Sequence, residues 1–504
     1  MRVTHLDMYA NFISNLNAGS SKLMELNNQA SSQKKINRPS DDPVGTIRVM
    51  EYRDSISALK QFKSNIDTGK GWLELADETL MQVNELLTRA KAIAEQAATG
   101  SLSAEQRDGL SYEVEQIFEQ LISLSNTTYE GKSIFAGQRV DGNAFERTLN
   151  VTSNKDDIQD EDIVSITGEK GGTTLVQFLD DGTVGTDDIG YRYSKDGGDT
   201  WTTINSTDAD ALTGTNATMN LGGTDVQLNS GYTVDASADT EDSSGTWLWV
   251  RPSARYLGDN EDNVQVDKAA VFSAGLDIEA EGDFQSGTVV RIDSLDAGNV
   301  EYSYSTDGGT SWSTGHETTT GENKYVVPGG IMEVTAGSIQ EGDQFFIRPE
   351  KAGIDFQISP NESLQVNNIG KDVFGGITGD DEGNLQSTVF GRGSGDNVFE
   401  TMGEFIGYLK TNNQQGIQES LEKLGSNIKH ISNTLASVGS RENRLDVAEK
   451  SMTSLIGNEE ERMSNIEDVD IAELMTKLSS QQVAYQAVLQ SSSRIMKMSL
   501  MNYI

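Results

Sequence analysis

The sequence predicts an α+β multidomain protein, in which an α-helical coiled coil or bundle from both termini carries a β-rich central insert of two tandem β domains. Three observations support this fold class: the placement of the prolines, apolar residues at seven-residue spacing in both flanks, and an internal repeat in the middle. The 504 residues are enough for several hydrophobic cores, because single cores rarely grow beyond about 250–300 residues.

Proline is absent from two long stretches of the chain. The six prolines are Pro39, Pro43, Pro252, Pro328, Pro349 and Pro360. A proline inside a helix costs about 3 kcal/mol. The stretches 44–251 and 361–504 can therefore contain long helices.

The N-terminal flank carries a heptad repeat. Apolar residues recur every seven positions, at Leu59, Ile66, Leu73, Leu80, Leu87 and Ala94. With a second set three positions later, they predict a long coiled-coil helix from about residue 52 to 98. Gly100 marks its end, and Ser103 with Gln106 has the spacing of a capping box that begins another helix.

The C-terminal flank repeats this pattern. Its apolar residues alternate four and three positions apart, at Ile417, Leu421, Leu424, Ile428, Ile431, Leu435 and Val438. A shorter apolar set from Val398 to Leu409 comes before them. Such stripes need apolar partners, so we expect N-flank and C-flank helices to pack as one antiparallel bundle.

The extreme ends carry weaker stripes in segments rich in Ser, Asn and Gln. Two such segments predict a marginal helix pair that becomes ordered on assembly; alternatively, they simply extend the bundle. The predicted assembly interface consists of Leu6, Ile13, Leu16, Leu23, Ile471, Leu474, Leu478, Tyr485, Val488 and Ile495.

The middle, 146–395, has short Val/Thr/Tyr runs separated by Gly, Asp and Asn, which is typical of β-strands and turns. Tyr191–Trp201 matches Tyr302–Trp312, and Trp249–Pro252 is echoed by Phe346–Pro349. This repeat predicts two related β domains with a boundary near 255–275.

Both copies of the repeat contain S-x-D-x-G-x-[ST]-W, at Ser194–Trp201 and Ser305–Trp312. The pattern resembles the Asp-box of sialidase-type propellers, where it forms a hairpin turn away from the catalytic residues. Glycine supplies the positive φ angles of such a turn. A propeller needs at least about four blades, so we interpret the two copies as hairpins only.

Composition argues against several functional classes. The net charge is −39, and residues 146–395 hold 44 acidic and 14 basic residues, so neither nucleic acid nor an anionic membrane is an expected partner. With no cysteine and three dispersed histidines, we expect no catalytic site, metal site or cofactor. The acidic pairs Asp156/Asp157 and Asp187/Asp188 are interpreted as solvated loops rather than calcium sites.

Five short motifs lie near the two ends: Ser31–Pro43 (S-S-Q-K-K-I-N-R-P-S-D-D-P), Gly131–Gly137 (G-K-S-I-F-A-G), Val438–Leu445 (V-G-S-R-E-N-R-L), Asp468–Glu473 with Tyr485–Ala487, and Ser499–Ile504. Together they resemble the flagellin superfamily, and within it the hook–filament junction proteins, also called hook-associated protein three. The first motif has Gln33 where the family usually has glycine. Pro39 and Pro43 break the terminal helix there, and Ser40 or Asp41 is expected to cap the next one.

The resemblance implies a radial architecture. Residues 1–40 with 465–504 would form an inner terminal coiled coil, and 41–145 with 396–464 a helical bundle. The β domains 146–265 and 266–395 would face solvent.

The implied protein is a non-enzymatic, secreted, extracellular subunit of the bacterial flagellum that joins the hook assembly to the filament. It would self-associate into a layer between a neighbouring hook-associated protein and flagellin. Its terminal helices would fold on association. Residues 1–20 lack the pattern of a cleavable signal peptide, which fits delivery by the flagellar export machinery.

Three alternatives remain open. The first is a flagellin-type filament subunit of the same fold. The second is a glycan-binding adhesin acting through the β insert, which glycan binding by the isolated 146–395 fragment would support. The third is a secreted glycosidase, and inertness of that fragment toward glycosides would argue against it.

Overall fold

A computed structural model describes the chain except for residues 1–4, 101, 156–157, 169–171, 209–210, 215–216, 241–243, 260–263, 269–275, 283, 285, 296–298, 320–322, 349–351, 379–386 and 502–504. The side chains of 5–9, 161, 265, 277, 336, 492 and 494–501 are also not described. The chain divides into two compact units, each considered by itself. The terminal unit comprises 1–68, 357–362 and 445–504, and the body unit comprises 69–356 and 363–444.

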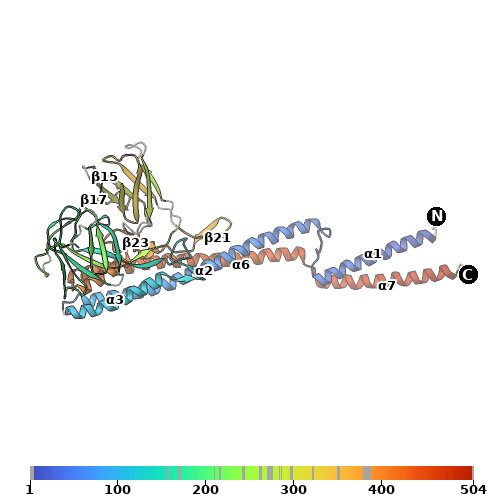
Figure 1. The fold of residues 1–504 in the computed structure, drawn as a ribbon. Helices are drawn as coiled ribbons and strands as arrows, with labels where there is room; N and C mark the ends of the chain where they lie inside the picture. The colour runs from blue at the N-terminus through green and yellow to red at the C-terminus, as the bar shows by residue number, and fades with distance from the viewer. Residues whose placement is uncertain are drawn as a thin grey trace. The chain divides into compact units, whose positions relative to one another are not determined.

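All described α-helices except α4 (Gly370–Phe374) come from the two flanks (Figure 1), as the proline distribution predicts. The flank helices are α1 (His5–Ser32), α2 (Pro43–Ala97), α3 (Ala104–Ser125), α5 (Val398–Lys410), α6 (Gln414–Glu467) and α7 (Ile471–Met501). In the terminal unit, α1 and α7 run antiparallel and pack against each other. In the body unit, α3 packs on α5, and α5 packs on the strand β12 (Trp247–Tyr256).

The heptad seam is confirmed in the body unit. Every seventh apolar residue of both long helices is buried there: Leu73, Leu80, Leu87 and Ala94 on α2, and Ile417, Leu424, Ile431 and Val438 on α6. The capping box is also present, because the Gln106 amide donates to Ser103 Oγ at 3.4 Å and the Ser103 amide donates to Gln106 Oε1 at 3.0 Å. Helix α2 begins at Pro43, earlier than the heptads indicate, since proline is well suited to a first helical position.

The first group of strands contains a large sheet ordered β24-β23-β12-β5-β7-β8, with β3 also paired to β12. Smaller sheets, β4-β10-β9 and β11-β6, enclose one apolar core with it. The bounds are β3 (Phe145–Ser153), β4 (Ile163–Gly168), β5 (Thr174–Phe178), β6 (Gly182–Thr183), β7 (Tyr191–Ser194), β8 (Thr202–Ile204), β9 (Ala217–Asn220), β10 (Thr224–Leu228), β11 (Thr233–Val234), β23 (Ile377–Thr378) and β24 (Ser387–Thr388). A short 3₁₀ helix, η1, spans Asp160–Asp162.

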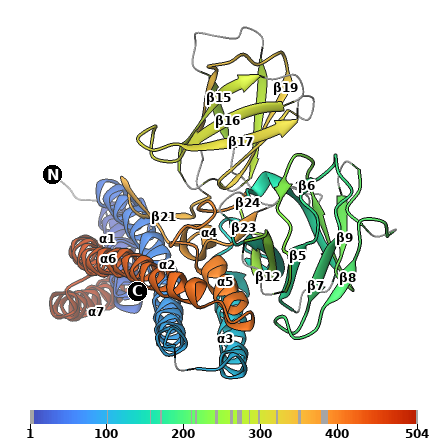
Figure 2. The ribbon, with the colours of Figure 1, turned by 90° about the vertical axis from the view of Figure 1, so that its left-hand side faces the viewer.

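The second group of strands has two antiparallel sheets, β13-β20-β15-β16-β17 and β14-β19-β18, around a separate apolar core (Figure 2). We call it the outer β module. Its strands are β13 (Gln265–Lys268), β14 (Asp277–Gly282), β15 (Thr288–Leu295), β16 (Asn299–Ser305), β17 (Ser313–Thr319), β18 (Lys324–Val327), β19 (Gly330–Ala336) and β20 (Gln344–Arg348). Two cores are compatible with tandem β domains, but the boundaries 146–265 and 266–395 stay a prediction. After the outer β module the chain returns to the first group of strands, where β23 pairs in parallel with β12 and Ile377 lies opposite Arg255.

Two small hairpins complete the chain: β1 (Thr128–Tyr129) with β2 (Lys132–Ser133), and β21 (Asp355–Ser359) with β22 (Glu362–Gln365). The first lies at the start of the Gly131–Gly137 motif. Among the described residues, no helix combines the length and apolar character that crossing a bilayer requires.

Candidate assembly interface

The α1–α7 pair of the terminal unit is held by a narrow apolar seam. Leu26 and Leu474 are buried in it. At Gly19 the helices come close, because a Cβ placed there would lie 3.3 Å from Cδ2 of Tyr485. The terminal stripes thus find apolar partners partly within their own chain.

The ten predicted interface residues differ in exposure. Leu474 is buried, whereas Ile13 and Ile471 are exposed, the latter by 55%. Five are half-buried along the pair: Leu16, Leu23, Leu478, Tyr485 and Val488. The side chains of Leu6 and Ile495 lie outside the described residues. No contact with another chain tests these residues, so their role in assembly stays a prediction.

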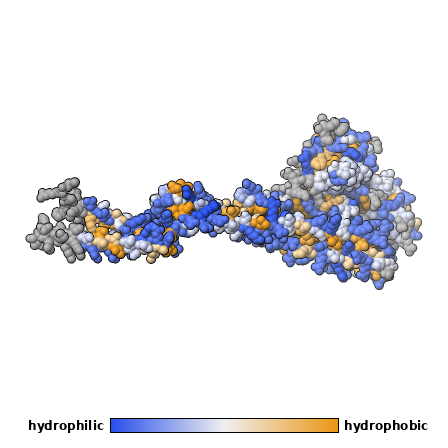
Figure 3. All heavy atoms as spheres, turned by 180° about the vertical axis from the view of Figure 1, so that it is seen from behind, coloured by the Kyte–Doolittle hydropathy of each residue, from blue (hydrophilic) through white to orange (hydrophobic). Residues whose placement is uncertain are grey.

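The terminal unit also exposes apolar side chains that the sequence analysis did not select. Met24 on α1 and Met475, Val483 and Leu489 on α7 are exposed, Val483 by 64%. Figure 3 shows apolar surface along these helices. They lie outside the apolar stripes that we selected. The sequence alone could not identify them as exposed, because it does not show which side of each helix faces its partner.

A second exposed apolar stripe lies at the start of α2. Val44, Ile47 and Met50 recur at three-residue spacing, so they share one side of the first helical turns. Val447 and Leu455 of α6 are also exposed in the terminal unit. Exposed apolar side chains gathered on one part of a molecule mark interaction sites.

Residues 33–35, between α1 and α2, are hydrogen-bonded to residues 467–469, at the junction of α6 and α7; we call this place the neck. The Lys35 amide donates to the Glu467 carbonyl at 2.7 Å, and the Val469 amide donates to the Gln33 carbonyl at 3.1 Å. The Glu467 carboxylate is buried and pairs with both Lys34 and Arg53. Two of the recognised motifs, Ser31–Pro43 and Asp468–Glu473, therefore meet at one place.

The backbone conformation at Gln33 explains why glycine is usual at this position of the motif. Its φ is 60°, in the left-handed region, which glycine adopts without the steric cost that a side chain brings. The cap of α2 differs from our expectation of Ser40 or Asp41: Asp42 accepts the Gly45 amide at 3.0 Å. Asp41 instead accepts the amides of the preceding turn, so the expectation was wrong by one residue.

Two motifs of the body unit also have defined roles. Gly137 has a φ of 64°, and a Cβ there would come within 1.6 Å of Oδ1 of Asp259, so only glycine fits. Arg441 holds the end of β22 and the residues that follow it, because Nη1 donates to the carbonyls of Gln365 and Asn367 at 3.3 and 3.1 Å. Burial lowers the pKa of Arg441.

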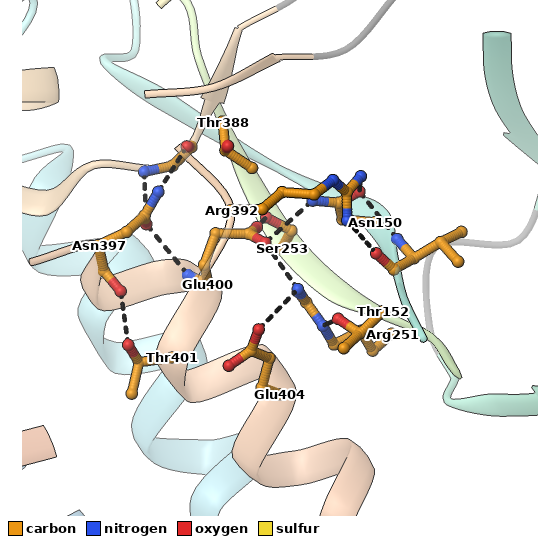
Figure 4. Close-up of polar contacts among 12 residues, drawn as sticks. Asn150, Thr152, Arg251, Ser253, Thr388, Arg392, Asn397, Glu400, Thr401 and Glu404 are labelled. Carbon is orange, nitrogen blue, oxygen red and sulfur yellow. Dashed lines mark hydrogen bonds and ion pairs between the residues drawn. The ribbon is translucent and has the colours of Figure 1, made fainter. Parts of the chain in front are cut away.

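A buried ionic network fixes α5 to β12 in the body unit (Figure 4). Arg251 Nη2 lies 2.6 Å from Glu400 Oε2 and 3.7 Å from Glu404 Oε1. Its Nε donates to Thr152 Oγ1 at 2.7 Å, and Ser253 donates to Glu400. Burial alone would raise the pKa of Glu400, but the Arg251 charge and these hydrogen bonds outweigh it and lower that pKa.

Both Asp-box motifs form the expected hairpin turns. Ser194 Oγ and Ser305 Oγ each accept a glycine amide at 2.8 Å. The indoles of Trp201 and Trp312 donate to glycine carbonyls at 2.8 and 3.1 Å. A hydrogen bond from Thr200 is the main reason that the pKa of Asp196 falls to about 2.

One of the two acidic pairs, Asp187/Asp188, is described by the structure, and its first aspartate is hydrogen-bonded to the backbone of its own loop. Asp187 Oδ2 accepts the Thr183 amide at 2.9 Å, and the Asp156/Asp157 pair lies outside the described residues. Within the part of the chain that is described, no three His, Asp or Glu side chains are grouped to hold a metal ion.

Comparison with known families matches both ends of the chain. Residues 3–139 match the bacterial flagellin N-terminal helical region, and 421–504 match the bacterial flagellin C-terminal helical region. Both ends of the chain are therefore flagellin-like helical regions. Members of these families are structural proteins rather than enzymes.

Three known flagellar proteins are similar to this chain. Flagellin of Salmonella muenchen is 22% identical over 94% of this chain and 93% of its own length. Flagellar hook-associated protein 3 of Salmonella typhimurium is 26% identical over 29% of this chain, and the match spans about half of that relative, 47%. The crystal structure of flagellar hook-associated protein 3 from Legionella pneumophila aligns with 83% of this chain and 98% of its own, at 16% identity and a TM-score of 0.32.

Proposed function

We propose that this chain is a structural subunit of the bacterial flagellum that joins the hook assembly to the filament. The observation that carries the proposal is the neck, where two flagellin-superfamily motifs bring both chain ends into one helical unit. The Phe135-Ala136-Gly137 motif and the match to hook-associated protein 3 favour the junction over the filament.

The proposed mechanism is association through the exposed apolar faces of the terminal unit. The α1–α7 seam holds the pair together, while Ile471, Met475 and Val483 remain exposed for neighbouring copies. Each fully buried leucine or isoleucine contributes about 1.5–3 kcal/mol. Association through several such residues in each copy would stabilise a layer, in contact with a neighbouring hook-associated protein and with flagellin. The chain would reach this site through the flagellar export machinery.

Gene deletion tests the assignment. If the chain forms the junction, cells without it carry hooks but no filaments, and intact filament protein accumulates in the medium. Electron microscopy and a gel of the medium measure both outcomes. Normal filaments on the deletion strain would contradict the proposal.

A filament subunit is the second candidate, because the match to flagellin of Salmonella muenchen covers nearly the whole of both chains. In that case the deletion strain would carry hooks without filaments, and the medium would contain no shed filament protein.

A point variant tests the mechanism. Val483→Asp places a charge on an exposed face of α7, so the helix content of the isolated chain should stay unchanged while complementation of the deletion strain fails. Gln482→Asp, at the neighbouring exposed position, is the matched control and should restore filaments. Full complementation by Val483→Asp would show that this face is not used.

A further inference from the structure

The side chains of Asp259 and Lys371 form an ion pair in the body unit that is fully shielded from water. Lys371 Nζ lies 2.9 Å from Asp259 Oδ2, and both side chains are 0% exposed. The site is independent of the terminal helices on which the proposed function rests.

The two residues bracket the outer β module. Asp259 comes just after β12, and Lys371 lies on α4, so all strands from β13 to β22 lie between them in sequence. Three segments converge beside the pair: the Asp259 amide donates to the Ala136 carbonyl at 3.0 Å, and the Gly370 amide donates to the Phe135 carbonyl at 2.7 Å. The pair thus sits where the chain leaves for this module and returns from it.

Aromatic rings and closely packed backbone lie near the pair. Phe374, three residues after Lys371, packs edge-on against Phe135 with ring centroids 5.1 Å apart. The carboxylate of Asp259 occupies the space that a side chain at position 137 would fill. Asp259 also holds a φ of 58°, an unfavourable conformation for a residue with a side chain, and such conformations concentrate at functional sites.

As an ion pair, this arrangement is costly. Two charges removed from water lose their hydration, and replacing a buried pair with apolar side chains is often neutral or stabilising. Burial disfavours both charged forms, whereas their mutual attraction favours them. Proton transfer from the ammonium to the carboxylate within the pair gives the neutral amine and carboxylic acid that condensation requires. An amine held against a carboxyl group in fixed geometry reacts as though at very high concentration.

We propose that Lys371 and Asp259 join in an intramolecular amide bond that closes a covalent loop around the outer β module. The ammonium first transfers a proton to the carboxylate. Lys371 Nζ then attacks Cγ of Asp259, the new C–N bond forms, and one C–O bond breaks. The hydroxyl leaves with a proton from the amine as one molecule of water, so the reaction needs neither oxidant nor reductant.

The amide supplies a covalent cross-link to a chain that contains no cysteine. Tension applied along the chain on both sides of the module would then pass through the bond at its base, and the strands of the module would not bear it.

Intact mass of the denatured full-length chain tests the proposal. The wild type should be lighter than its sequence by the mass of one water molecule, and a protease digest should contain a branched peptide that joins the segments bearing Asp259 and Lys371. A wild-type chain with its full sequence mass after complete folding would overturn the proposal.

Lys371→Arg is the matched control, because it keeps the positive charge and lacks the reactive amine. It should have its full sequence mass. Aspartates followed by glycine, such as Asp196, can also lose water by cyclising, and that loss would persist in Lys371→Arg. Persistence of the loss in this variant, or absence of the branched peptide from the wild type, would overturn the amide.

Discussion

The terminal unit and the body unit differ in how much apolar surface they expose and in how many charged side chains they bury. Of the fourteen large apolar side chains that are exposed among the described residues, eleven belong to the terminal unit. The body unit buries charge: Arg251, Glu400 and Lys371 are all in its interior. A unit that exposes apolar surface offers it to partners, whereas the charges buried in the body unit find their counter-charges within that unit.

The largest expected effect is a loss of stability in the body unit. Glu400→Gln leaves Arg251 buried without its closest counter-charge, which should lower the free energy of unfolding by about 3–5 kcal/mol. Urea unfolding followed by tryptophan fluorescence measures this, because all five tryptophans lie in the body unit. Glu113→Gln is the control: its pair with Arg89 is exposed and should contribute less than about 1 kcal/mol. Equal losses would mean that burial of the Arg251 network contributes nothing.

The second prediction compares neighbouring residues on α2. Leu80 is 0% exposed and Met81 is 52% exposed. Leu80→Ala should destabilise the body unit by about 2–5 kcal/mol through the cavity it leaves, and Met81→Ala by less than about 0.5 kcal/mol. The same fluorescence assay measures both. Similar values for the two variants would show that the heptad seam does not stabilise this unit.

The third prediction concerns pH. The pKa of Glu400 in the folded chain lies below its ordinary value of 4.5. The carboxylate therefore contributes stability that is fully present above that value and is lost as pH falls through the lowered folded pKa. Urea midpoints between pH 7 and pH 3 should fall for the wild type more steeply than for Glu400→Gln. If the urea midpoints of the two proteins fell equally with pH, Glu400 would not contribute to the loss of stability in acid.

The smallest expected effect is a gain of stability in the terminal unit. Gln33→Gly relieves the left-handed backbone and should stabilise the neck by about 0.5–1 kcal/mol, after the added flexibility of the unfolded chain is counted. Thermal melting followed by helix circular dichroism measures it. Asn27→Gly, in the interior of α1, should instead destabilise by about 1 kcal/mol. A loss of stability in Gln33→Gly would contradict the strain argument.

The features that the sequence predicted correctly depend on short-range patterns. Seven-residue spacing identified the seam through Leu73 and Leu80, and the repeated Asp-box identified two hairpins. Pro39 and Pro43 identified the break between α1 and α2, although the cap proved to be Asp42. Spacing and turn chemistry are local, so a single sequence contains them.

What the sequence could not predict depends on distant pairs. Arg251 and Glu400 lie 149 positions apart, and no local pattern links them or links Asp259 to Lys371. Likewise, the apolar periodicity of α7 could not say that Leu474 would be buried while Ile471 stayed exposed. That distinction needs the position of α1.

The neck has a consequence for the order in which the chain matures. Its hydrogen bonds join residues 33–35 to 467–469, so no chain can close it before residue 469 has been delivered. Contacts of such long sequence separation form late, because loop closure must come before them. A chain cut short anywhere in the β region would still build local hairpins, but its two ends would never meet. Closure of the neck therefore requires both ends of the chain, and a truncated copy cannot form it.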